Sequence, residues 1–303
     1  MNTYRATLTW LILMSATQSF APRGYGADRQ WLAELEVKLV PIADKTHLKQ
    51  LAFSGPLRIQ RPFYPEGGVC HLYVLHPPGG LVSGDQLKIQ AHCAANSQSL
   101  LTTPSAGKIY GRDSDGVAQG QRVRLQLTDN AECEWLPQET LVYRNANALL
   151  DTHIELDSDA RFIGWDLVCL GRPAAGEVFD KGQLDQRIRL WRNGRLLFNE
   201  RLQLTADSSL QHSRVGFADQ CVFGTLVASG PDFDTEHLDA LLNELRACLP
   251  SPVFTITQRL GVLLVRYLGN DMNECRAGMW QAWSLIRPML LGRPACIPRI
   301  WLT

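Results

Sequence analysis

The chain has 303 residues, of which 45% are hydrophobic and 20% charged, and its 30 Lys+Arg residues balance its 30 Asp+Glu residues. This is an ordinary globular composition, and the length suffices for one large domain or two small ones. A formal net charge of zero without a basic stripe argues against a nucleic-acid-binding protein.

The N-terminal 30 residues differ from the rest of the chain. Arg5 precedes an apolar stretch, residues 6–16, which resembles a signal peptide with a thin positive region. The stretch is too short for a membrane span, which needs roughly 20 residues. The alternatives are a mobile extension and a start codon placed upstream of the real one.

From residue 31 to residue 268 the dominant pattern is an alternation of apolar and polar residues, which predicts half-buried strands. It is clearest in residues 86–93 and 121–128. The pair Asn193-Gly194 lies between two apolar runs and predicts a two-residue hairpin. We therefore expect a mainly β protein.

Two segments near the C-terminus have helical spacing instead. Residues 235–249 carry a stripe of leucines, and residues 271–287 carry a stripe of Met, Cys and Trp. Pro288 is expected to end the second helix. Such a stripe is typical of a core-facing helix, but the large aromatic side chains of Trp280 and Trp283 also suit a partner-binding face.

The eight cysteines are scattered and form no C-x-x-C pair, which argues against a zinc knuckle or a thioredoxin-like site. Several alternate with apolar residues inside the predicted strands, where a free Cys behaves as a small hydrophobic residue. The pattern predicts reduced thiols, most of them in the core.

The sequence lacks the motifs of several common enzyme classes. Residues 79–84 have the glycine spacing of a phosphate loop, but Asp85 stands where that loop needs Lys, and its carboxylate would repel phosphate. Neither a G-x-S-x-G elbow nor an H-E-x-x-H zinc motif occurs. His71 and His76 are five apart on a predicted strand and so point to opposite faces. We expect a protein that is not an enzyme, although two carboxylates could in principle meet as a glycosidase pair.

The block of residues 55–85 reads GPLRIQRPFYPEGGVCHLYVLHPPGGLVSGD, with Glu66 and Asp85 at its two bends. It predicts two strands joined by a stiff Pro-rich connection and followed by a glycine turn. In order and residue identity the block resembles the signature of the UreD (also called UreH) family of urease accessory proteins. The resemblance continues downstream in residues 101–110, 134–143, 162–179, 199–202 and 223–228. It predicts one UreD-like domain over residues 31–303 and leaves residues 1–30 outside.

The resemblance implies stacked, β-helix-like sheets with a few helices, a cytoplasmic location and a non-catalytic role. Members of the family bind UreF, which recruits the GTPase UreG, and the complex docks on apo-urease. GTP hydrolysis is then coupled to nickel insertion, and UreD is thought to offer nickel an internal passage. The cytoplasmic role disfavours the signal-peptide interpretation, and neither nucleic acid nor a membrane is an expected partner.

A nickel passage makes its own chemical demands. Ni(II) binds strongly to His and Cys cages, so a conduit should offer isolated carboxylates, carbonyls and water. The sequence has no His/Cys cluster, so we expect transient Ni(II) and no permanently bound cofactor. The first candidates are Glu66 and Asp85, followed by Asp166 and Glu177. Glu139 and Glu200 also lie in matching motifs, and for each of these residues an ion pair with a nearby Arg is the alternative.

Two other functions remain as hypotheses. The apolar N-terminus, the aromatic content and the acidic residues are compatible with a secreted β-rich carbohydrate-binding protein or glycosidase. A metallochaperone that binds nickel tightly by itself is the third possibility.

Overall fold

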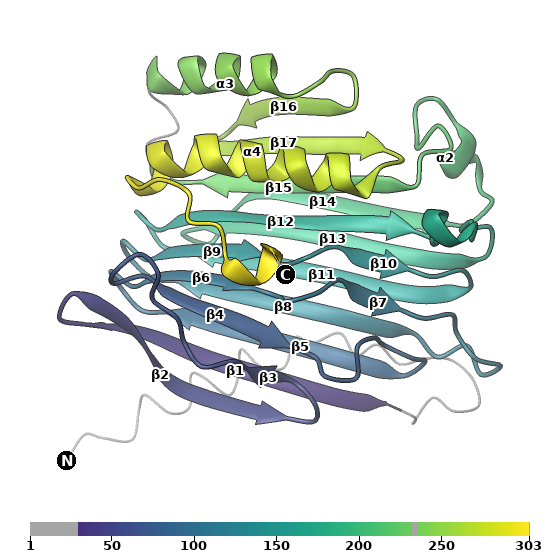
Figure 1. Cartoon of the computed structure of the whole chain (residues 1–303), viewed down its shortest axis with the longest axis horizontal. Helices are drawn as coiled ribbons and strands as arrows, with labels where there is room; N and C mark the ends of the chain where they lie inside the picture. Colours follow the sequence, from purple (N-terminus) through teal and green to yellow (C-terminus); the bar gives the residue numbers. More distant parts are fainter. Residues whose placement is uncertain (1–29, 232–235, 303) are drawn as a thin grey trace.

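Two stacked β-sheets form most of the molecule (Figure 1). The structure is a computed structural model, and it describes residues 30–231 and 236–302. The first sheet has seven described strands, in the order β14 (Arg195–Thr205), β13 (Gly182–Arg192), β11 (Ala146–Leu156), β8 (Gln119–Leu127), β5 (Asp85–Cys93), β1 (Trp31–Ile42) and β2 (Lys45–Ser54).

The second sheet has ten described strands. Its main path is β16 (Phe254–Arg259), β17 (Val262–Gly269), β15 (Val222–Ser229), β12 (Arg161–Leu170), β9 (Glu132–Leu136), β6 (Gln98–Thr102), β4 (Cys70–Leu75) and β3 (Arg58–Ile59). Two short strands lie off this path, β7 (Gly107–Ile109) and β10 (Thr140–Val142), and β10 pairs with both β7 and the end of β12.

The chain winds between the two sheets as a flattened helix of strands. It passes from β4 to β5, back to β6, on to β8, back to β9, on to β11, back to β12 and on to β13. Each return adds one parallel strand beside the previous one, which gives the parallel ladders β5–β8–β11–β13 and β4–β6–β9–β12. Antiparallel strands such as β2 and β14 complete the edges. The prediction of a mainly β, β-helix-like fold is confirmed.

The predicted alternation places one face of each strand between the sheets. In β11 every second residue from Ala146 to Leu156 is buried, and the residues between them are more exposed. Corners of the winding contain asparagines with positive φ, 61° at Asn96 and 67° at Asn145, a conformation that Asn tolerates better than most residues. The hairpin at Asn193 and Gly194 is confirmed, because both residues have positive φ and join β13 directly to β14.

The helices belong mainly to the C-terminal part. Those with bounds inside the described residues are the short η2 (Pro173–Ala175), α2 (Ser209–His212) and η4 (Arg299–Leu302), and the longer α3 (Glu236–Cys248) and α4 (Met272–Leu291). In Figure 1, α4 lies across the outer side of the ten-stranded sheet near β15 and β17, with α3 beside β16.

The expected end of the second helix at Pro288 was wrong. α4 includes Pro288 and continues to Leu291, where Gly292 adopts φ 65° and donates its N–H to the Pro288 carbonyl. A proline in the last turn removes one backbone hydrogen bond. The burial of Leu290 and Leu291 against the sheet offsets that loss.

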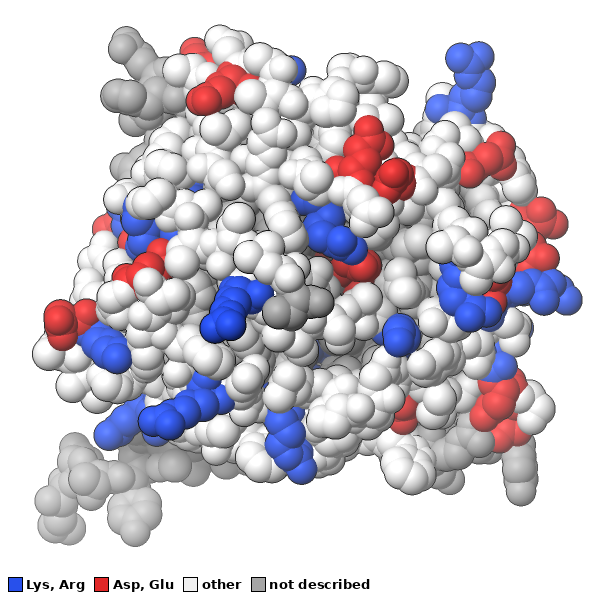
Figure 2. Space-filling view, viewed as in Figure 1, with Lys and Arg blue, Asp and Glu red and all other residues white. Residues whose placement is uncertain are grey.

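Few charges interrupt the face that carries α4. Figure 2 shows most of it without acidic or basic side chains, and both signs are scattered over the remainder. None of the helices formed by the described residues combines the length and apolar character that a membrane span requires. The signal-like stretch of residues 6–16 lies outside the described residues.

Candidate functional site

A cavity of about 340 Å³ lies between the sheets, where the ten-stranded sheet is interrupted. Residues 103–106 separate β6 from β7, and residues 137–139 separate β9 from β10. The breaks lie side by side because β6 pairs with β9 and β7 with β10. Each break contains a proline, Pro104 or Pro137, which cannot donate a hydrogen bond to a neighbouring strand. Both prolines line this central cavity.

Asp166 is an acidic residue that lines the central cavity. It belongs to the face of β12 that also carries Phe162 and Val168, both buried between the sheets. The hydroxyl of Thr152, on β11 of the opposite sheet, donates to Asp166 Oδ2 at 2.9 Å. A second hollow, of about 10 Å³, is also lined by Thr152 and Asp166 and reaches Thr225. The two side chains therefore separate a roomy space from one that holds roughly a single water molecule.

Burial raises the pKa of Asp166 to about 6. Hydrogen bonds with Thr152 and Gln186 favour the charged form, while the negative charges of Glu200 and Asp151 oppose it. A carboxylate in this environment gains from any cation that replaces its proton.

Replacing Asp166 with Asn is expected to stabilise the protein at high pH. Folding raises this pKa from its ordinary value of 3.8, so the buried charge destabilises the folded chain increasingly as the pH rises from 3.8 to about 6, and the cost is absent below that range. We expect Asp166→Asn to raise the free energy of unfolding by about 2 to 3 kcal/mol at pH 8 and by nothing near pH 3.5. Urea unfolding of the variant and of the unmodified chain measures the difference in the free energy of unfolding at each pH. A gain of equal size at both pH values would contradict the explanation.

Asp85 lies near the central cavity without bonding to Asp166. Its Oδ2 accepts the backbone N–H of Val82 at 2.9 Å, which closes the turn before β5. His76 lines the cavity, and burial lowers its pKa while the nearby charge of Asp85 opposes that shift. The two histidines lie apart, as predicted, because His71 is fully buried beside Glu66.

Glu66 belongs to a buried ion cluster instead. Its Oε1 accepts from Arg287 Nη2 at 2.6 Å and its Oε2 from Arg287 Nη1 at 2.8 Å, while His71 Nε2 lies 2.6 Å from Oε1. Burial alone would raise the pKa of Glu66, but the hydrogen bonds and charges of His71 and Arg287 lower it to about 2. Arg287 also bonds both oxygens of Glu134, and neither Arg287 nor Glu134 is accessible to solvent.

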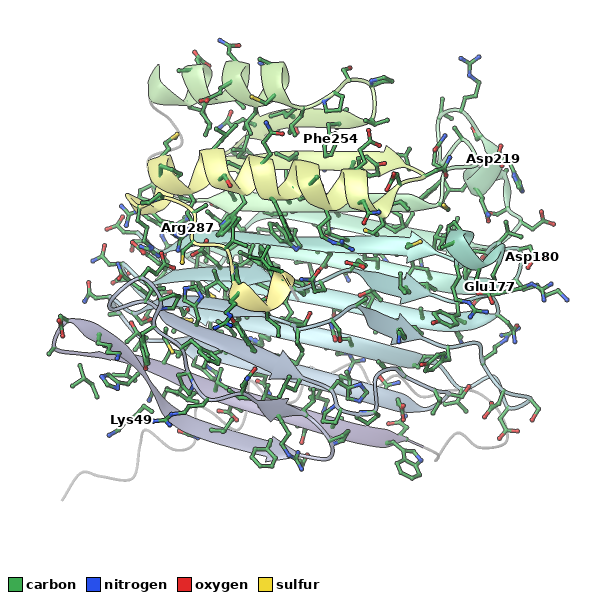
Figure 3. The ribbon with its side chains drawn as sticks, in the orientation of Figure 1. Lys49, Glu177, Asp180, Asp219, Phe254 and Arg287 are labelled. Atoms are coloured by element: carbon green, nitrogen blue, oxygen red, sulfur yellow. The ribbon has the colours of Figure 1, made fainter. Side chains whose placement is uncertain are left out.

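Glu177 lies far from this cluster, at the opposite end of the face in Figure 3. Its Oε2 accepts from Arg172 Nη2 at 2.7 Å, and this hydrogen bond lowers the pKa of the carboxyl. The backbone N–H of Arg144 donates to its other oxygen. Glu177 has the ion pair with a neighbouring Arg that the sequence offered as an alternative, and it does not line the central cavity.

The two tryptophans of α4 have different environments. Trp283 is completely buried and donates its indole N–H to Glu134 at 2.6 Å, so the expectation that it faces a partner was wrong. Its side chain fills the core and satisfies a buried carboxylate. Trp280 is half-buried and stacks on Trp301 of η4, with 5.0 Å between ring centroids. Of these two tryptophans, only Trp280 has a partly accessible side chain.

Three polar residues of this region escaped the analysis of the sequence: Thr152, Gln186 and Arg287. Thr152 and Gln186 occupy the buried half of alternating strands, between Leu150 and Ile154 and between Leu184 and Ile188. A polar residue in an otherwise apolar register is a signal that could have found both. Arg287 gave no comparable signal, since its partner Glu66 is 221 positions away.

The thiols of the described residues lie mostly in the core, where Cys93 contacts Cys133 and Cys169 contacts Cys221. Five of the eight free cysteines are buried, in agreement with the prediction of core thiols. Within residues 30–231 and 236–302 no group of three or more His, Cys, Asp and Glu side chains is arranged to hold a metal ion.

The chain is similar over almost its whole length to known proteins. A family model described as UreD urease accessory protein matches residues 32–302. The urease accessory protein UreD of Marinobacter nauticus is 46% identical over 287 residues, which cover 92% of this chain and 95% of that protein. Those of Saccharophagus degradans and Pseudoalteromonas translucida are 41% and 39% identical, over 91% and 98% of this chain and 94% and 99% of theirs.

Proposed function

The chain belongs to the UreD urease accessory protein family, and we propose that it is a non-catalytic chaperone that helps to insert nickel into urease. In this proposal it acts in the cytoplasm with UreF and the GTPase UreG on apo-urease. The family match over residues 32–302 carries the proposal. The Asp85 carboxylate in place of a phosphate-loop Lys agrees with hydrolysis of GTP by a separate chain.

The finer part of the proposal is a passage for Ni(II) through the central cavity, with Asp166 as its central ligand. The cavity is more than wide enough for several water molecules, which would keep the ion partly hydrated. Thr152 and Gln186 hold the carboxylate in place, and the cluster offers no cage that would retain the ion. Transient Ni(II) is here cargo and not a cofactor.

The other predicted carboxylates have lesser parts in this proposal. Asp85 lies near the cavity and would add negative potential there. Glu66 would have to exchange Arg287 for the cation, and Glu177 would have to exchange Arg172. The exchange at Glu66 is costly, because its partner Arg287 is fully buried. The geometry favours Asp166 over both.

The two alternative functions agree less well with these observations. A secreted carbohydrate-binding protein or glycosidase does not fit a member of a urease accessory family. The tight nickel metallochaperone would need a ligand cluster, and the described residues arrange none.

A complementation experiment tests the proposal. We expect deletion of this gene to leave urease assembled but nickel-free, and expression of the full chain to restore both nickel content and activity. A tagged chain should elute with UreF, UreG and urease subunits in size-exclusion chromatography. Normal nickel content in the deletion strain, or the absence of all three partners from the eluted complex, would overturn the proposal. Variants of Trp280, such as Trp280→Ala, then test whether its accessible face contributes to this assembly.

A further inference from the structure

A row of polar side chains leads from the central cavity toward one edge of the molecule. Asp166 on β12, Thr225 on β15 and Arg266 on β17 are direct neighbours across three adjacent strands of the ten-stranded sheet. The second hollow joins the first two of these residues, because Asp166 and Thr225 both line it. The row therefore continues beyond Asp166, on the side away from the central cavity.

Glu200 faces the end of this row from the opposite sheet. It lies on β14, the edge strand of the seven-stranded sheet. Its Oε1 accepts the hydroxyl of Thr225 at 2.8 Å, and its Oε2 accepts Arg266 Nε at 2.8 Å and Nη2 at 2.7 Å. The side chains of Arg266 and Glu200 are 35% and 31% exposed, so the buried row reaches solvent here.

Arg266 is the one member of the row that carries a positive charge. The other members, Asp166, Thr225 and Glu200, offer oxygen atoms, which suit a divalent metal ion. The guanidinium occupies Glu200 Oε2, and its charge repels any cation that approaches. Its flexible side chain can leave the carboxylate without disturbing the strand, since part of it is already in solvent.

We propose that the Glu200–Arg266 ion pair is a gate at the end of the row, where a divalent cation binds Glu200 only by displacing Arg266. This inference rests on the proposed passage. It adds a second opening of that passage, at which the ion pair controls the entry of cations. Thr225 keeps Glu200 directed toward the row when the guanidinium leaves. An ion with high affinity for carboxylate oxygen opens the gate, whereas the monovalent ions of the solvent do not.

The test is equilibrium dialysis of the full chain with Ni(II) alone. We expect Arg266→Gln to tighten binding by about tenfold, which corresponds to 1.4 kcal/mol. The charge-conserving Arg266→Lys should stay within about twofold of the unmodified chain, because it keeps the repulsion. The double variant Arg266→Gln/Glu200→Gln should lose the gain, since the freed carboxylate is then absent.

Two results would overturn the gate. The first is unchanged affinity in Arg266→Gln, and the second is a gain that persists in the double variant, which would locate the added binding elsewhere. Urea unfolding midpoints establish that each variant is folded, and Arg266→Met serves as a second neutral variant with the same two outcomes. The assay needs no urease, so its failure is separate from failure of the passage, which is tested by nickel incorporation in Asp166→Asn.

Discussion

Asp166→Asn is expected to lower nickel incorporation into urease by at least about tenfold at limiting nickel while the assembly with partners stays intact. The substitution keeps the shape of the side chain and an acceptor for Thr152, but it removes the negative charge at the junction of the two hollows. A neutral amide binds a divalent cation far more weakly than a carboxylate. Nickel per urease active site, measured after co-expression, gives the result.

The same variant should be more stable than the unmodified chain at pH 8, because it lacks the charged carboxylate, which burial disfavours and whose pKa burial therefore raises. A protein that is more stable and yet defective in nickel transfer cannot owe the defect to unfolding. Asp185→Asn is the matched control, since Asp185 lies on β13 beside Gln186 and is held by Arg201 on the outer face. Normal nickel incorporation in Asp166→Asn, or an equal loss in Asp185→Asn, would contradict the passage.

Arg287→Met is expected to cost about 3 to 5 kcal/mol of unfolding free energy. The substitution leaves Glu134, which is fully buried, without its charged partner and removes both hydrogen bonds from Glu66. Among the described residues, Trp283 then remains as the side-chain partner of Glu134, and His71 as that of Glu66. Urea unfolding at pH 7 measures the change.

A surface ion pair provides the comparison for Arg287. Arg201→Met removes the two hydrogen bonds to Asp185, but Arg201 is exposed and Asp185 is partly exposed, so the cost should be much smaller than that of Arg287→Met. Replacing Glu66, Glu134 and Arg287 together by Gln, Met and Met should recover much of the lost stability, because no buried charge is left unpaired. A cost below about 1 kcal/mol for Arg287→Met would show that the cluster does not stabilise the fold.

Local patterns accounted for the elements that were predicted correctly. The alternation in β11 and the Asn-Gly pair before β14 depend on neighbours within a few residues, and both gave the right structure. Pro288 shows the limit of such rules, because burial of the last turn of α4 against the sheet outweighs the lost hydrogen bond. Trp283 shows the same limit, because the spacing of apolar residues along a helix does not reveal whether another part of the chain covers that face.

The sequence by itself determined the family, the mainly β fold and the acidic residues to consider, because periodicity and ordered motifs are properties of the chain alone. Only the tertiary structure decided which carboxylate pairs with an Arg and which one lines a cavity. Winding brings Arg287 to Glu66 across 221 positions and leaves Asp166 beside a cavity that two interrupted strand pairs create. Charge pairing and desolvation act through space, so the roles of Glu66 and Asp166 follow from the packing of the sheets and not from their place in a motif.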